Sequence, residues 1–289
     1  MIDMTVIILT RNEEDNIERC INSIKDHVKR VVVLDSYSTD STLDKAKALG
    51  ADIYQHEFKH YGAQFQYGID NCDIKTKWIF RLDADEEVSP ETCKELETLC
   101  KKHADTDVNG FVFRLNEMFM NKQMKHGGLS VLEKLCIFKT GTAYMEDRYL
   151  GEQLILTSGR SVKLKTLSYH YNYRSMSFWI NKFNWYTTRE VKDYFIQKEN
   201  ENKQELSSLD TPTKIRRFIK YNIYYKLPSG MRTHMLFIYF YYIKLGFLDG
   251  REGLYWNFFL SYFYRMLVDA KMYEVEKLHT KIGETGTWD

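Results

Sequence analysis

The sequence has little proline, and it lacks the cysteine and charge patterns that mark several classes of protein. Only three prolines and no low-complexity run occur in 289 residues, which predicts that most of the chain is ordered. The five cysteines form no CxxC pair, so we expect neither a zinc site nor a disulfide framework, and a reducing compartment suits the chain. A formal net charge of +1 argues against a strongly basic nucleic-acid binder and against an acidic disordered chain.

Long apolar runs are also missing. The longest one, Met235–Leu248, contains Lys244 and is shorter than the ~20 residues that a helix needs to cross a bilayer. A strand-like run begins close to Met1 with no basic segment or cleavage site before it, so we expect no signal peptide. These features predict a cytoplasmic protein. Its 44% of apolar residues suffice for the core of one large domain or of a domain with an appendage.

The glycine-rich and nucleophile motifs of several α/β proteins do not occur. The sequence has no G-x-G-x-x-G after a strand, no GxxxxGK[ST] and no G-x-S-x-G. Their absence argues against α/β proteins that bind dinucleotides or phosphates, or hydrolyse esters, through these motifs.

What the sequence does contain is an alternation of short apolar runs with amphipathic segments. Thr5–Leu9 and Val31–Leu34 are continuous and rich in β-branched residues, which is typical of strands buried on both faces. Between them, Glu13–Val28 has apolar residues at helical spacing on one face. The alternation predicts an α/β fold with a mostly parallel sheet flanked by helices. Further strands are predicted over 51–54, 78–82 and 110–115, and further helices over 41–49, 62–71 and from Ser89-Pro90 onward.

The composition changes near Tyr169. Beyond it the strand signals disappear, tryptophan and tyrosine mix with lysine and arginine, and helices are predicted over 177–199, 212–225, 232–246 and 253–272. We therefore divide the chain into an α/β domain over 1–172 and a helical, aromatic-rich extension over 173–289. In the helix around 214–221, Ile215, Phe218 and Ile219 share one face. Such a helix can lie on an anionic membrane surface, or it can pack on the first domain with its charges in water.

Three polar clusters follow predicted strands, namely Thr10–Glu13, Asp35–Asp40 and Asp83–Glu87. Ligands of open α/β sheets bind at the carboxyl ends of the strands, so neighbouring parallel strands would bring the three clusters to one crevice. A nucleotide-sugar needs polar partners for its base and ribose. It also needs a hard cation, Mg²⁺ or Mn²⁺, held by one or two carboxylates together with phosphate oxygens.

The D-x-D pair Asp83 and Asp85 can supply carboxylates for the ribose and the cation, while Asp35 can accept from the base and Thr10 can bond the uridine. The alternative for D-x-D is a solvated turn, which is how we interpret Asp105-x-Asp107 in its polar loop. The position of the first pair directly after the strand WIFRL favours function. For Asp40, capping of the following helix is a sufficient explanation.

The segments TVIILTRNEEDNIERCINSI, VVVLDSYSTDST and WIFRLDADEEVSPE together resemble glycosyltransferase family 2, which has the GT-A fold. The closer resemblance is to the branch that includes lipopolysaccharide core β-1,4-glucosyltransferases. That branch pairs D-S-x-S-x-D with D-A-D-E, has a glutamine-bearing helix between them, matched here by Tyr61–Gln64, and has a late F-L-D-G-R-E-G segment, matched by Phe247–Gly253. The similarity touches most of the chain and is thin over 182–232.

Carried over by position, the resemblance implies inversion at the anomeric carbon with a carboxylate as general base. In the branch this base lies in a V-H-E segment, whose place Asp147–Glu152 takes here with Gly151 in the position of the His. We predict Glu152 as the base, with Asp147 as its rival and Glu146 as a weaker one. The other implied positions are nucleotide contacts from Thr10, Arg11, Glu13, Asp35, Gln64 and Asp83, and metal contacts from Asp85 and His170. The alternative for His170 is a packed structural histidine.

The resemblance thus predicts a metal-dependent transfer of sugar from a nucleotide-sugar, with a UDP-sugar expected, to a hydroxyl of a lipid-linked or free glycan. Lipopolysaccharide or another cell-surface polysaccharide would be the product, and residues 173–289 would face the acceptor or the inner face of the cytoplasmic membrane. A nucleotidyltransferase that makes nucleotide-sugars is a second hypothesis, but the glycine-rich loop usual there has no counterpart in TRNEEDN. A non-catalytic glycan-binding or membrane-binding module is a third, which the intact Asp35, Asp83 and Asp85 set disfavours.

Overall fold

The structure is a computed structural model that describes residues 1–146, 153–199 and 211–279. The chain divides into two compact units. Unit 1 consists of Met1–Glu117 and Val131–Asn172, and unit 2 consists of Met118–Ser130 and Tyr173–Asp289. Unit 1 thus ends where the composition changes. The segment 118–130, which the sequence places in the first domain, belongs to the helical unit.

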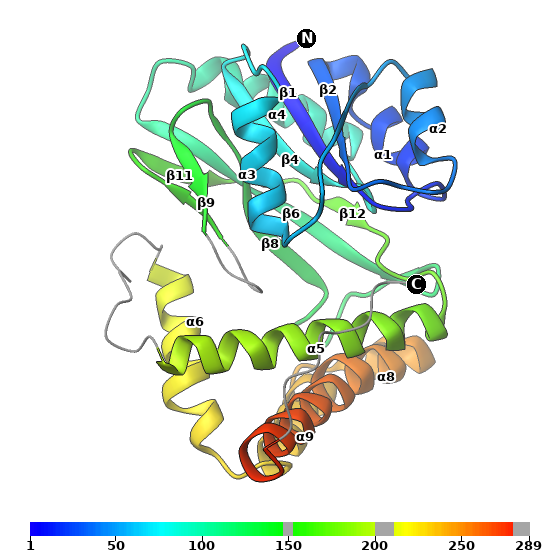
Figure 1. Cartoon of the computed structure of the whole chain (residues 1–289), viewed down its shortest axis with the longest axis vertical. Coiled ribbons are helices and arrows are strands. Elements are labelled where there is room, and N and C mark those ends of the chain that lie inside the picture. The colour runs from blue at the N-terminus through cyan, green and yellow to red at the C-terminus, as the bar shows by residue number, and fades with distance from the viewer. Residues whose placement is uncertain (147–152, 200–210, 280–289) are drawn as a thin grey trace. The chain divides into compact units, whose positions relative to one another are not determined.

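Unit 1 is built on a mixed sheet (Figure 1). The strands are β1 (Ile2–Thr10), β2 (Val28–Asp35), β3 (Asp52–Gln55), β4 (Trp78–Asp83), β5 (Glu86–Glu87), β6 (Val108–Phe119), β8 (Val131–Lys139), β9 (Ala143–Met145), β10 (Leu154–Leu156), β11 (Arg160–Lys163) and β12 (Ser168–His170). Strand β6 runs on into unit 2, where β7 (Lys122–Gln123) pairs with its end. The strand order is β3-β2-β1-β4-β8-β6-β12-β5, with β11 and β7 also beside β6, while β9 and β10 pair separately. The strand pairs among β1, β2, β3 and β4 are all parallel, and β8 runs antiparallel to β4 and β6.

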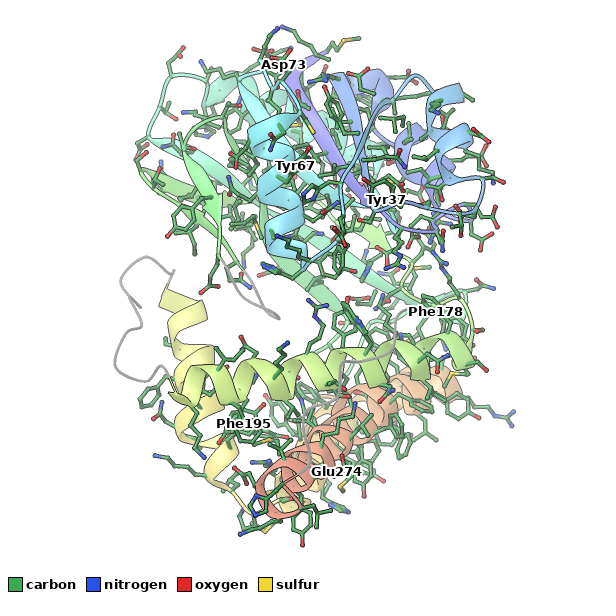
Figure 2. The ribbon with its side chains drawn as sticks, viewed as in Figure 1. Tyr37, Tyr67, Asp73, Phe178, Phe195 and Glu274 are labelled. Carbon is green, nitrogen blue, oxygen red and sulfur yellow. The ribbon has the colours of Figure 1, made fainter. Side chains whose placement is uncertain are left out.

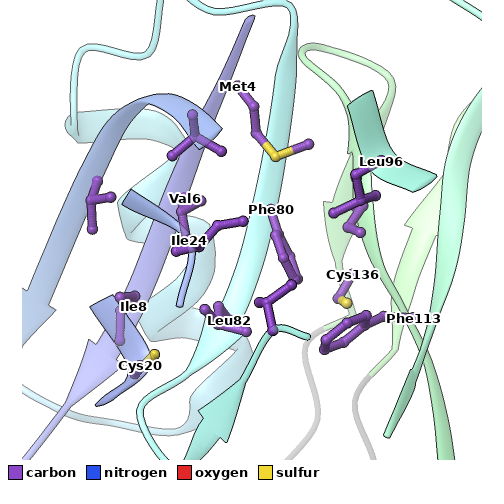
Figure 3. Close-up of a cluster of buried hydrophobic side chains, with 14 of the residues drawn as sticks. Met4, Val6, Ile8, Cys20, Ile24, Phe80, Leu82, Leu96, Phe113 and Cys136 are labelled. Carbon is purple, nitrogen blue, oxygen red and sulfur yellow. The ribbon is translucent and has the colours of Figure 1, made fainter. Parts of the chain in front are cut away.

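Two apolar cores cover the two faces of the sheet. The helices of this unit are α1 (Ile17–Asn22), the 3₁₀ helix η1 (Lys25–His27), α2 (Thr42–Ala48), α3 (Tyr61–Asn71) and α4 (Pro90–Lys102). On one face Met4, Val6 and Phe80 pack with residues of α1, α2 and α4 (Figure 3). On the other face Ile7 and Leu34 pack with residues of α3, β9 and β10. Because neighbouring residues of β1 enter opposite cores, this strand is apolar throughout, which confirms a strand buried on both faces.

Helix α1 is shorter than the sequence predicts. The expected helix over 13–28 ends at Asn22 because Ser23 competes for backbone groups. The Ser23 hydroxyl donates to the Cys20 carbonyl at 2.7 Å and accepts from the Val88 amide at 3.0 Å. The predicted buried face is nevertheless correct, since Ile17, Cys20 and Ile24 are fully buried. All five cysteines are buried free thiols, which confirms that they form no disulfide.

Unit 2 is helical and has an aromatic core. Its helices are α5 (Met176–Glu199), α6 (Thr211–Asn222), η3 (Tyr224–Lys226), α7 (Met231–Ile238), the π-helical η4 (Tyr239–Ile243), η5 (Gly246–Asp249), α8 (Gly250–Asn257), the π-helical η6 (Phe258–Phe263) and α9 (Tyr264–Lys277). Phe119, Trp179 and Trp256 form the centre of the core. Within the described ranges, no helix combines the length and the apolarity that crossing a bilayer requires.

Candidate active site

Three neighbouring strands bring the predicted clusters to one edge of the sheet. Strand β1 lies between β2 and β4, with Thr10 in register with Asp35 and Leu9 in register with Asp83. Asp35 and Asp83 therefore lie two strand spacings apart, roughly 10 Å. The expectation that these carboxylates share one sheet edge is confirmed.

Asp35 organises the loop that follows β2. Its buried carboxylate accepts from the Thr10 hydroxyl at 3.0 Å, from the Ser38 amide at 2.8 Å and from the Gln55 side chain at 3.3 Å. The Ser38 hydroxyl also donates to it. A carboxylate has about four acceptor positions, so these contacts fill it.

The loops after β1 and β2 hold each other in an unusual backbone conformation. Asn12 accepts from the Thr39 amide at 2.8 Å, and the Asn12 amide donates to the Ser38 hydroxyl at 2.9 Å. Asn12 and Tyr37 both have positive φ, 55° and 58°, and Tyr37 exposes its ring at this end of the sheet (Figure 2). Asparagine adopts such angles readily, whereas a tyrosine does so where its surroundings enforce them.

Three further polar residues lie in these loops. Asp40 and Glu13 bond to neighbouring groups, and Arg11 is exposed. Asp40 accepts from the Thr42 amide at 3.0 Å and from the Glu14 amide at 3.1 Å. Burial would raise the pKa of Asp40, but these hydrogen bonds outweigh it and the pKa is lowered. Asp40 thus holds the first residue of α2 from one position before the N-cap, which is Ser41 and not Asp40 as predicted. Glu13 accepts from the Asn16 side chain at 2.8 Å, and Arg11 is exposed.

Gln64 lies on α3 and ties together the loops after β2 and β3. Its buried amide donates to the Ser36 hydroxyl and to the His56 carbonyl, both at 3.1 Å. Its carbonyl oxygen lies 2.8 Å from His56 Nδ1. The His56 ring in turn stacks on Tyr67 of the same helix, with ring centroids 3.7 Å apart. The contacts of Gln64 therefore shape the loop next to Asp35.

Asp83 is held by a lysine from a strand that the sequence does not reveal. Lys134 of β8 places its Nζ 2.6 Å from Asp83 Oδ2 and 2.5 Å from Glu86 Oε1. Burial raises the pKa of Glu86 to about 7, although Lys134 opposes the shift. For Asp83, burial also acts to raise the pKa, but Lys134 and Arg81 outweigh it and the pKa is lowered.

Asp85 faces a histidine that is fixed from behind by a second carboxylate. His170 Nε2 lies 3.4 Å from Asp85 Oδ2, and His170 Nδ1 lies 2.9 Å from Glu117 Oε2. The Tyr171 amide donates to the Asp85 carbonyl at 2.8 Å and fixes β12 beside the D-x-D turn. Burial would lower the pKa of His170, but the two carboxylates outweigh it and raise that pKa. In the described part of the chain, no cluster of three or more His, Cys, Asp or Glu is arranged to hold a metal ion.

The predicted general bases lie outside the described residues. Asp147 and Glu152 both belong to the segment that connects β9 to β10. The residues that flank it are paired, because the Glu146 amide donates to the Gln153 carbonyl at 2.9 Å.

Sequence reasoning missed Lys134, Glu86 and Glu117. Lys134 is the charged residue ahead of the apolar run LCIF, and that break in polarity is the local signal that could have marked it. Glu117 ends the unit 1 part of β6, a strand predicted to stop at residue 115. No local pattern marks its contact with His170, since the two residues are 53 positions apart.

Comparisons with known proteins agree with this architecture. The family model described as Glycosyl transferase family 2 matches residues 5–162, more than half of the chain. An uncharacterized glycosyltransferase of Rickettsia typhi is 30% identical over 204 residues, which cover 67% of this chain and 68% of the relative. Another from Rickettsia prowazekii is 28% identical over 202 residues, with coverage of 67% and 68%.

A solved structure resembles nearly the whole chain. The mannosyltransferase PcManGT from Pyrobaculum calidifontis, in complex with GDP-Man and Mn²⁺, covers 95% of this chain and 88% of its own at a TM-score of 0.54 and 13% identity. A likeness at this identity concerns the fold, which is the GT-A arrangement of an α/β sheet followed by helices. From the family match, the relatives and the fold together, we conclude that the chain belongs to glycosyltransferase family 2 and is a glycosyltransferase.

Proposed function

We propose that the protein is an inverting, metal-dependent transferase that moves a sugar from a nucleotide-sugar to a hydroxyl of a glycan or glycolipid. The observation that carries the proposal is the convergence of the Asp35 loop with the Asp83–Asp85 turn at one sheet edge. The Asp35 loop suits a nucleoside, and the Asp83–Asp85 turn suits a diphosphate with its cation. A UDP-sugar is the donor we propose.

The nucleoside would lie over the loops after β1 and β2. Among the partners of Asp35, the Gln55 amide at 3.3 Å is the most distant, so it is the contact that an N–H group of the base would replace. Thr10 orients the same carboxylate, and Asp83 is proposed for the ribose. Gln64 would act through the loop that it holds, and Arg11 and Glu13 are proposed to lie at the rim of the nucleotide site.

The residues around Asp85 fit a divalent cation. Two ligand atoms at right angles, each about 2.1 Å from the ion, lie roughly 3 Å apart, close to the 3.4 Å between Asp85 Oδ2 and His170 Nε2. Glu117 holds the opposite ring nitrogen of His170, the arrangement usual for a metal-binding histidine. The remaining positions would go to diphosphate oxygens and water, as is usual for Mg²⁺ or Mn²⁺. When bound, the cation would stabilise negative charge on the departing nucleoside diphosphate.

Glu152 is our proposal for the general base. Its carboxylate would take the proton of the acceptor hydroxyl while the acceptor oxygen bonds to the anomeric carbon and the bond from that carbon to the phosphate oxygen breaks. This displacement inverts the anomeric carbon and needs no covalent enzyme intermediate. Asp147 is the rival for the role.

The acceptor proposal rests on the closer motif resemblance. We propose a lipid-linked or free glycan of the lipopolysaccharide core or of another cell-surface polysaccharide, and a protein that works in the cytoplasm at the inner face of the membrane. In the structure, Asp249 of FLDGREG accepts from the Lys125 and His126 amides at 2.9 and 2.8 Å, so this motif supports the fold of unit 2. Residues 173–289 are proposed to form the acceptor side.

Turnover of nucleotide-sugars with and without Mn²⁺ tests the proposal. Asp85→Ala should abolish metal-dependent release of nucleoside diphosphate, whereas Asp105→Ala, in the exposed second D-x-D, should leave it unchanged. Equal activity of wild type and Asp85→Ala in the presence of metal would overturn the metal assignment. Release of pyrophosphate in place of nucleoside diphosphate would support a nucleotidyltransferase, and a lack of UDP binding with Mn²⁺ present would support a non-catalytic module.

A further inference from the structure

One helix of unit 2 buries polar residues and exposes apolar ones. In the continuous run of α7 and η4, six large apolar or tyrosine side chains are exposed at positions i, i+4, i+7, i+8, i+11 and i+12, which is one helix face. The same helix buries Arg232 and Thr233, both of which bond to the buried Asp269. The exposed residues are Met231, Met235, Ile238, Tyr239, Tyr242 and Ile243.

The next two segments expose further apolar residues. Aromatic contacts bring these segments together, since the rings of Phe237 and Phe258 lie 6.4 Å apart and those of Tyr241 and Phe247 lie 6.3 Å apart. On helix α8 the exposed apolar residues again follow helical spacing. The stripe and its continuation, Leu245, Phe247, Leu248, Leu254, Tyr255 and Phe258, are called the apolar face below.

The surroundings of the apolar face carry positive charge. Residues 211–258 contain eight lysines and arginines and two acidic residues, Asp249 and Glu252; of the eight cations, Lys220 is paired with Glu190 and the buried Arg232 with Asp269. Both acids have cationic or imidazole partners within unit 2, because Asp249 lies 2.8 Å from His126 Nδ1 and Glu252 lies 3.0 Å from Lys122 Nζ. Lys244 and Arg251, which lie between residues of the apolar face in the sequence, are exposed.

We propose that the apolar face docks on the surface of an anionic lipid bilayer. Exposed aliphatic side chains would enter the boundary between headgroups and acyl chains, tyrosines would lie at headgroup level, and Lys244 and Arg251 would meet the anionic headgroups. A second copy of the chain fits this face less well. A twofold interface would bring Lys244 and Arg251 of one copy near those of the other. The two acidic residues of 211–258, Asp249 and Glu252, already have partners within unit 2 and would offset this repulsion poorly.

This docking deepens the acceptor part of the proposed function, since it would hold the enzyme where a lipid-linked glycan is found. The binding itself requires neither a donor nor turnover. Its failure can therefore be told apart from failure of the transferase proposal, which the assay of nucleoside diphosphate release tests separately.

Co-sedimentation of the full chain with vesicles tests the proposal. We expect binding to phosphatidylcholine vesicles with roughly a third phosphatidylglycerol to exceed binding to pure phosphatidylcholine by about tenfold, and to weaken in ~0.5 M NaCl. The double variant Ile243→Glu/Leu248→Glu should lose this binding by at least about tenfold, since it puts charges where acyl chains would be. Replacement of Lys244 and Arg251 by glutamine should cost about fivefold for each charge.

The matched control is Leu278→Glu. Leu278 is 64% exposed and Ile243 is 65% exposed, but Leu278 lies outside the apolar face. We expect Leu278→Glu to bind vesicles like the wild type, and circular dichroism to show the same helix content in all variants. Wild-type protein that stays in the supernatant at low salt, or equal vesicle binding by the double variant, would overturn the proposal. The proposal would also be overturned if the wild type formed a dimer and bound no vesicles, and if the double variant were a monomer.

Discussion

Lys134→Met should be destabilising because Lys134 compensates the fully buried Glu86 and also Asp83, whose side chain is 32% exposed. The Lys134 side chain is 13% exposed, and its Nζ lies 2.6 Å from Asp83 and 2.5 Å from Glu86. Methionine has nearly the same shape but no charge. Removal of one member of a buried ion pair costs up to about 3–5 kcal/mol. At neutral pH the cost is limited because Glu86, whose pKa is already raised to about 7, takes up a proton once Lys134 is gone.

Lys163→Met is the matched control. Lys163 Nζ also lies 2.6 Å from a carboxylate, that of Glu133, but its side chain is 55% exposed. Solvent screens such a pair, so this variant should lose less than about 1 kcal/mol. Both lysines lie in unit 1 and have ion pairs of similar length; they differ in burial and in the number of carboxylates that they contact, two for Lys134 and one for Lys163.

Urea unfolding at neutral pH, followed by circular dichroism, measures both losses. Adding Glu86→Gln to Lys134→Met should recover part of the lost free energy of unfolding, because it removes one of the two uncompensated carboxyl groups. A loss below about 1 kcal/mol for Lys134→Met, or equal losses for the two lysine variants, would refute the account of Lys134 as a buried counter-charge.

Three further predictions concern metal binding, the general base and the helical unit. Glu117→Gln keeps a hydrogen-bond acceptor for His170 but removes its charge, so calorimetry should show Mn²⁺ binding weakened by about 10–100-fold. Glu152→Gln should reduce nucleoside diphosphate release by about 10²–10⁴-fold while UDP binding stays unchanged, and Asp147→Asn should reduce it less; the opposite order would make Asp147 the base. Burial would raise the pKa of Glu190, but Arg265 and Lys220 outweigh it and lower that pKa. Its stabilisation of unit 2 is therefore complete above the unfolded carboxyl pKa of about 4.3 and declines below it, so the urea midpoints of wild type and Glu190→Gln should converge as the pH falls from 7 towards 3.

Local sequence patterns determined the central strands and the position of the site along the chain. A strand buried on both faces must be apolar at every position, so TVIIL and VVVL predict β1 and β2 without any knowledge of the rest of the fold. Polar residues that directly follow such strands must lie at the carboxyl edge of a parallel sheet. The convergence of Asp35 and Asp83 could therefore be expected from sequence alone.

Only the tertiary structure decided which groups complete the two carboxylate sites. Lys134 meets Asp83 from 51 positions away, and Glu117 meets His170 from 53 positions away. Strand β8, which carries Lys134, and the short strand β12, which carries His170, have mixed polarity, because their contacts come from neighbouring strands and not from a repeating local pattern. The exposed apolar face of unit 2 escaped prediction for a related reason. Helical spacing shows which residues share a face, but only packing shows whether that face is turned inward or outward.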